Sequence, residues 1–157
     1  MASLPGGHGT FFSLVYIVVS ITKGGVIMLN TRCILAPRRG DDGLRISVMN
    51  RHTLTDGVTP DRRIAPASFD AWWPELAPAS ALLGAYYKQG LPWKEFEERF
   101  RNHLLSHQRD SLEELVRISW DSPVTILCIE ATLRRCHRRL VAEVCLKIDP
   151  RLRVSIA

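Results

Sequence analysis

The segment from Pro123 to Ile148 constrains the fold most, because it combines a strand, a polar loop and a helix. The residues after Pro123 form an apolar, β-rich run that ends at Cys128 and predicts a buried strand. From Cys136 onward apolar residues recur at helical spacing, which predicts a helix. In open α/β sheets, ligands bind beyond the carboxyl ends of strands, where helix N-termini favour anions. We therefore expect a site in this loop, which contains Cys128, Glu130, Cys136, His137 and Arg138.

Two earlier segments, 31–36 and 44–49, have the composition of strands. Three helical patterns follow: 79–89, a second that starts near Pro92 and carries an aromatic stripe, and a third that starts with a capping box at 110–114. Ser68 is expected to cap a short helix that carries Phe69, Trp72 and Trp73. These elements predict a small α/β domain with a mainly parallel sheet flanked by helices, and a helical insertion between the second strand and the Cys128 strand.

Residues 1–27 differ from the rest of the chain. Their apolar run, 11–21, is too short to span a bilayer, and Lys23 is the first charged residue, so a basic signal-peptide region is missing. Lys23-Gly24-Gly25 can be encoded by a purine-rich ribosome-binding sequence, and we expect translation to start at Met28. Residues 1–27 would then be a non-native extension, disordered or loosely packed, and 28–157 a single α/β domain. Without an export signal, the four cysteines are expected to be reduced thiols of a cytoplasmic protein.

The loop after the second strand is the other polar segment of interest. If that strand is parallel to the Cys128 strand, both loops open at one edge of the sheet. Arg51, His52, Thr53 and Asp56 then allow two interpretations. They form a turn-stabilising network around the Asp56-Gly57 turn pair, or Arg51 and His52 capture an anion near Arg138.

The chain from Met28 to about Leu146 contains four motifs: Arg51-His52-Thr53-Leu54-Thr55-Asp56-Gly57, Trp73-Pro74-Glu75-Leu76-Ala77-Pro78, Trp93-Lys94-Glu95-Phe96-Glu97-Glu98-Arg99-Phe100, and Cys128-Ile129-Glu130 followed by Cys136-His137-Arg138. In these motifs the chain resembles the bacterial domain of unknown function 488 (DUF488) family. The resemblance implies an α/β fold in a cytoplasmic bacterial protein. It implies no established reaction, so the chemistry has to be argued from the residues.

The strand-to-helix loop offers a reactive thiol. A helix N-terminus and nearby arginines stabilise a thiolate, so the pKa of Cys136 is expected to be lowered, unless the thiol is buried and only packs. His137 is expected to orient or deprotonate a thiol, or to be a structural residue that is satisfied by Glu130 or a main-chain carbonyl. Cys128 is most simply a small buried apolar residue. It also begins a Cys-x5-Arg spacing like that of cysteine-dependent phosphatases, but the loop contains no glycine to cradle a phosphate.

No metal or cofactor is expected, because the Cys and His spacing matches no usual zinc signature. The leading hypothesis is a domain that binds an anionic small molecule, such as a nucleotide or phosphate ester, with Arg51 and Arg138 on the anion. Cys136, His137 and Glu130 would be the reactive or orienting groups. The net charge of +5 leaves open a nucleic-acid-binding module that uses the four arginines of segment 134–139. A structural partner protein is a third possibility. The sequence does not decide whether the protein is an enzyme.

Overall fold

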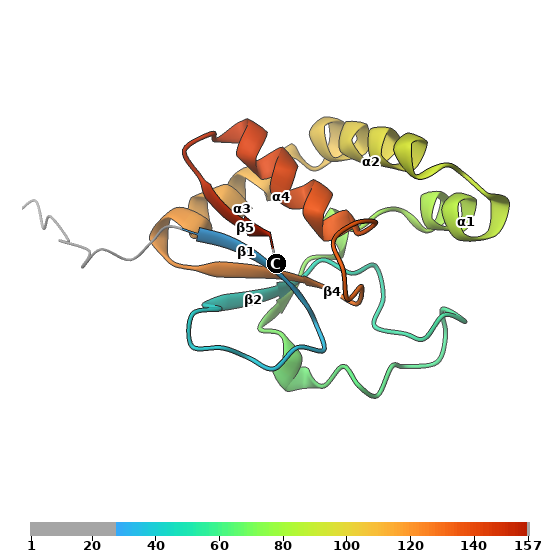
Figure 1. Cartoon of the computed structure of the whole chain (residues 1–157), viewed down its shortest axis with the longest axis horizontal. Coiled ribbons are helices and arrows are strands. Elements are labelled where there is room, and N and C mark those ends of the chain that lie inside the picture. The colour runs from blue at the N-terminus through green and yellow to red at the C-terminus, as the bar shows by residue number, and fades with distance from the viewer. Residues whose placement is uncertain (1–27, 157) are drawn as a thin grey trace, which may run out of the picture.

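The computed structural model describes residues 28–156, which fold into a five-stranded sheet covered by helices on one face (Figure 1). All strand pairs are parallel, and the strand order is β3-β2-β4-β1-β5. The strands are β1 (Met28–Cys33), β2 (Leu44–Ser47), β3 (Ala71–Trp72), β4 (Val124–Cys128) and β5 (Arg153–Ile156). The predicted α/β class and parallel sheet are confirmed.

Four helices accompany the sheet: α1 (Ser80–Gln89), α2 (Trp93–His107), α3 (Arg109–Asp121) and α4 (His137–Ile148). The first three lie between β3 and β4 in the chain and form the predicted helical insertion. Two 3₁₀ helices, η1 (Pro66–Ser68) and η2 (Pro74–Leu76), flank β3. Within residues 28–156, no helix has both the length and the apolar character needed to cross a bilayer.

The connections explain why helices cover only one face. From β1 to β2 and from β2 to β3 the chain moves toward the β3 edge through irregular segments, whereas from β3 to β4 and from β4 to β5 it moves back through helices. Parallel crossovers are nearly always right-handed, so connections in opposite directions must pass over opposite faces. Figure 1 shows this arrangement, with α3 and α4 on one side of the sheet and the irregular segments on the other. The main core lies between the helices and the sheet and includes Leu29, Ile46, Ile126, Phe100 and Val141.

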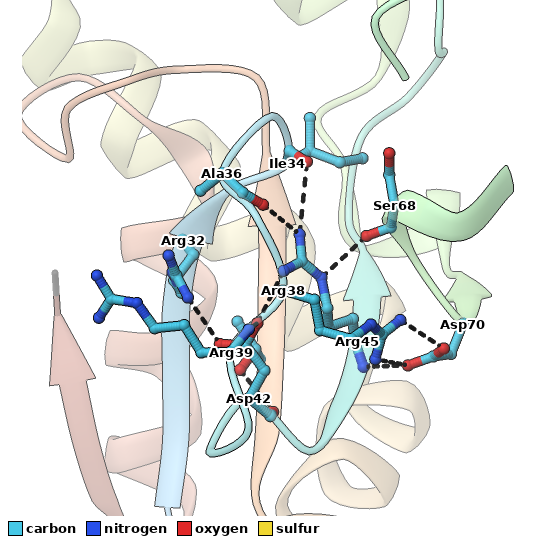
Figure 2. Close-up of polar contacts among 10 residues, drawn as sticks. Arg32, Ile34, Ala36, Arg38, Arg39, Asp42, Arg45, Ser68 and Asp70 are labelled. Atoms are coloured by element: carbon cyan, nitrogen blue, oxygen red, sulfur yellow. Dashed lines mark hydrogen bonds and ion pairs between the residues drawn. The ribbon is translucent and has the colours of Figure 1, made fainter. Parts of the chain in front are cut away.

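On the other face, a buried arginine ties the irregular segments to the sheet. The side chain of Arg45 is 1% exposed and donates hydrogen bonds to the carbonyls of Ile34, Ala36 and Ser68 and to the carboxylate of Asp42 (Figure 2). Buried loop carbonyls need donors, and the five N–H groups of one guanidinium can supply several. Arg45 therefore fixes the path of the chain just after β1, next to the carboxyl edge of the sheet.

Three local predictions were wrong. A strand, β3, replaces the short helix expected around Phe69–Trp73, because the main chain there pairs with β2 and Trp73 N donates to Ser47 O at 2.9 Å. Helix α3 begins at Arg109, so the expected capping box lies inside its first turn, and the N-cap residue Gln108 makes no side-chain capping bond. Strand β1 starts and ends three residues earlier than expected, and β5 was not predicted. The expectation for residues 1–27 lies outside the described residues.

Candidate active site

The candidate site lies where β2 and β4 end side by side. From these neighbouring strands the chain leaves in opposite directions, toward β3 and toward β5, which opens the kind of crevice in which α/β proteins bind ligands. Cys128 is the last residue of β4, Cys136 is the N-cap residue of α4 and His137 is its first residue. The predicted strand-to-helix loop therefore brings these three residues together. Their side-chain ligand atoms lie within 4.8 Å of one another.

His137 is oriented by the main chain of the neighbouring strand. Its Nε2 lies 2.6 Å from the carbonyl oxygen of Val48, which can only accept, so Nε2 carries the proton. The other ring nitrogen, Nδ1, is 3.6 Å from the Cys128 Sγ. Burial lowers the pKa of His137, so the neutral ring is favoured. Its free lone pair therefore faces a thiol.

The pKa values of the two thiols are shifted in opposite directions. The pKa of Cys128 is lowered, mainly by a hydrogen bond from the Cys136 thiol, with help from the Glu130 main-chain N–H and the positive charge of Arg138; burial opposes this shift. The pKa of Cys136 is raised, because it is the donor to Cys128 and because it is buried. This agrees with the buried alternative expected for Cys136 and not with the lowered pKa of a thiol at a helix N-terminus. The positive charge of Arg138 favours a thiolate here, and the thiol whose pKa is lowered is Cys128.

Arg138 is a buried cation with incomplete partners. It is 0% exposed, and its Nη1 donates to the Glu130 carbonyl at 2.6 Å and to the Cys136 Sγ at 3.3 Å. Its Nε and Nη2 are buried and have no hydrogen-bond partner within residues 28–156. A buried guanidinium is normally compensated by an anion. No carboxylate in the described part of the chain forms an ion pair with it, which leaves a thiolate or a ligand to supply the negative charge.

Glu130 has a partner that the sequence did not indicate. Tyr87 on α1 is largely exposed and donates its hydroxyl to Glu130 Oε1 at 3.2 Å, and the pKa of Tyr87 is raised by partial desolvation and by the nearby Glu130 carboxylate. Of the two partners expected for His137, Glu130 or a main-chain carbonyl, the structure has the main-chain carbonyl of Val48. In the sequence, Tyr87 is marked only by its neighbour Tyr86. In the structure, the helix that carries both tyrosines has no buried residue.

A family model described as the active DUF488-N3 subclade, DUF488-N3a, matches residues 29–148. The chain belongs to this family. The resemblance seen in the sequence motifs is therefore confirmed, and the matched segment of this DUF488-N3a protein contains the whole Cys128–Arg138 loop. No curated protein and no solved structure matches the chain.

The second polar loop of the DUF488-N3a chain forms a turn network. Asp56 accepts hydrogen bonds from the main-chain N–H groups of Val58 and Thr59, both at 2.9 Å, and Thr53 makes an isolated bridge with Pro60. These contacts match the turn-stabilising interpretation of Thr53 and Asp56.

The two basic residues of that loop are also engaged. His52 bonds Ser47 at 2.8 Å and lies against the rings of Phe69 and Trp72. Exposed Arg51 donates to the Gly57 carbonyl and the Ser80 hydroxyl. In residues 28–156, no hydrogen bond connects either side chain to Arg138 or to the two thiols.

The DUF488-N3a site also contains donors that suit a soft metal ion, although none was expected from the spacing. In a tetrahedral zinc site the Zn–S distance is about 2.3 Å and the Zn–N distance about 2.0 Å, so a cysteine sulfur and a histidine nitrogen that bind the same ion lie about 3.5 Å apart. The Cys128 Sγ and His137 Nδ1 are 3.6 Å apart, and the bond from Nε2 to Val48 resembles the outer-shell bond of metal-bound histidines. Against a divalent ion, the Arg138 cation bonds the Cys136 Sγ directly.

Proposed function

We propose that this protein is an enzyme in which the Cys128 thiolate attacks an anionic small molecule, such as a nucleotide or phosphate ester, held by Arg138. One observation carries the proposal: a fully buried guanidinium, with two unpartnered nitrogens among the described residues, lies beside a pair of thiols at the carboxyl edge of a parallel sheet. The description of the family as an active subclade supports an enzyme.

The residues of the site have separate roles in this proposal. His137 Nδ1 faces Cys128 and is placed to receive its proton. The Cys136 thiol, the Glu130 N–H and Arg138 stabilise the charge left on the Cys128 sulfur. Arg138 Nε and Nη2 then bind anionic oxygens of the substrate. The Glu130 carboxylate, which Tyr87 orients, serves as the acid or base for the leaving group.

Substrate access requires a movement, because Cys128 is only 3% exposed. Helix α1 carries Tyr87, has no buried residue and packs on α2, so we propose that it opens the site. Free thiols at all four cysteines suit a reducing compartment, and we retain the cytoplasm as the proposed location.

The test is alkylation of the native protein by iodoacetamide, mapped by mass spectrometry, with and without AMP or inorganic phosphate. We expect Cys128 to react first at neutral pH and both anions to slow the reaction. Arg138→Met should abolish this protection, whereas Arg135→Met, which removes the same charge from an exposed position in the loop, should retain it. Equal protection in the two variants, or an unreactive Cys128, would contradict the proposal.

The nucleic-acid alternative gains little support from the basic segment 134–139. Arg138 is buried, and Arg139 forms ion pairs with Glu97 and Glu143. Arg134 and Arg135 remain as its exposed basic residues. Binding to duplex DNA that weakens steeply with salt would favour the alternative.

A further inference from the structure

The two thiols of the site form a pair whose chemistry goes beyond substrate attack. The Cys128 and Cys136 sulfurs lie within 4.8 Å of each other, and both cysteines are buried. The loop between them, 129–135, contains no helix or strand, and its two ends lie at β4 and α4. A disulfide bond requires this loop to let the sulfurs approach to roughly 2 Å.

We infer that Cys128 and Cys136 form a reversible disulfide when the protein meets a peroxide, with Cys128 as the oxidised thiol and Cys136 as the resolving thiol. This inference rests on the thiolate proposed for Cys128. It assigns to Cys136, which the proposed reaction uses only as a hydrogen-bond donor, a covalent role of its own.

The chemistry proceeds in two balanced steps. The Cys128 thiolate attacks one oxygen of hydrogen peroxide, the O–O bond breaks, and hydroxide leaves, which gives a sulfenic acid on Cys128. The Cys136 sulfur then attacks the Cys128 sulfur, the S–O bond breaks, and the departing hydroxide takes the Cys136 proton to form water. The hydroxide released in the first step takes the proton that His137 received from Cys128, so over both steps two thiols lose two electrons and two protons, and one peroxide is reduced to two waters.

The surroundings favour this order of events. Arg138 Nη1 lies 3.3 Å from the Cys136 Sγ, where it stabilises the negative charge that develops as Cys136 loses its proton. Both cysteines are buried, with residue exposures of 3% and 1%, so a molecule as small as peroxide is favoured over larger oxidants. A disulfide here removes the nucleophile and would switch off the proposed enzyme until a dithiol reduces it.

The other two cysteines supply controls. Cys145 is fully buried in the main core, between the helices and the sheet. Cys33 lies beside Cys128 in the strand register, but its thiol donates to the Ile129 carbonyl at 3.3 Å. Cys33 is therefore the competing partner, and Cys33→Ser is the matched control for Cys136→Ser.

The experiment treats the full chain with one equivalent of hydrogen peroxide, unfolds it in denaturant, counts free thiols with a maleimide and maps the disulfide by mass spectrometry. We expect the number of free thiols to fall from four to two, a Cys128–Cys136 link, and full recovery with dithiothreitol. Cys33→Ser should form the same link. Cys136→Ser should instead yield a Cys128 sulfenic acid that dimedone traps.

Two outcomes overturn the inference alone: a link from Cys128 to Cys33, or no disulfide in a protein whose Cys128 still reacts with iodoacetamide. In either case the proposed nucleophile survives. If Cys128 reacts with neither reagent, the proposed function fails as well. Zinc retained at one ion per chain that blocks both reactions would assign the site to a metal and also overturn the inference.

Discussion

The ring of His137 donates a 2.6 Å hydrogen bond to the main-chain carbonyl of Val48, which joins the start of α4 to the end of β2. These residues are 89 positions apart in the sequence. Because a main-chain carbonyl cannot change its chemistry, this bond fixes the tautomer of the imidazole. It also aims Nδ1 at the Cys128 Sγ.

The two nitrogens of His137 can be tested separately. His137→Ala leaves the Val48 carbonyl without its donor, and we expect a loss of about 1–3 kcal/mol in the free energy of unfolding, measured in urea. His137→Gln places an amide N–H near the position of Nε2 and should recover most of that loss. Neither variant has a basic nitrogen at the position of Nδ1, so Cys128 should be alkylated more slowly in both at neutral pH. Normal reactivity in the glutamine variant would show that Nδ1 has no role.

The charges around Cys128 predict opposite shifts of its pKa. Arg138 lowers this pKa and Glu130 raises it, so Arg138→Met should move the pH at half-maximal alkylation upward and Glu130→Gln should move it downward. In the native protein the half-maximal pH should lie below the roughly 8.5 of a free cysteine. Shifts of the same sign in both variants would mean that structural change, not charge, controls the thiol.

The sequence predicted the region of the site but not its electrostatics. The strand to Cys128 and the helix from His137 have strong local patterns, and the βα rule then places their loop at a sheet edge. The pKa of Cys128 is lowered and that of Cys136 is raised by their interaction with each other and by burial, which depend on the tertiary structure. Tyr87 was missed because it is 43 positions from Glu130, and no local pattern links them.

The fold was predictable to a similar extent. The long amphipathic helices and the two buried strands follow from periodicity, which depends only on neighbours in the sequence. Strand β3 has two residues, and its pairing with β2 is set by tertiary structure, so a helical interpretation of the Trp72 region was wrong. The hydrogen bonds from Arg45 to the carbonyls of Ala36 and Ser68 likewise correspond to no local sequence pattern.

The buried ion pair between Asp42 and Arg45 predicts a large effect on stability. Asp42 bonds Arg45 at 2.8 Å and also Arg32 at 2.9 Å, and Arg45 is almost fully buried. Asp42→Asn leaves a buried cation without its anion and should cost about 3–5 kcal/mol in the free energy of unfolding.

A more exposed pair on the same face provides the control for this prediction. Arg38 pairs with Asp70 at 2.7 Å with both side chains well exposed, so Arg38→Met should cost less than about 1 kcal/mol. Similar losses in Asp42→Asn and Arg38→Met would show that burial does not set the strength of these pairs.

The turn after α4 predicts how stability depends on acid. Hydrogen bonds from Arg151 lower the pKa of Asp149 to about 2, and Trp120 also donates to this carboxylate at 3.0 Å. A carboxyl group whose pKa is lower in the folded state stabilises the fold above its unfolded pKa of about 4. This contribution is lost as the pH falls through the folded value.

Asp149→Asn keeps an acceptor for Trp120 but loses the charge, so it should be less stable than the native protein at pH 7, and the difference should shrink between pH 4 and 2. Urea unfolding at several pH values measures this difference, and a gap that stays constant down to pH 2 would contradict the assignment.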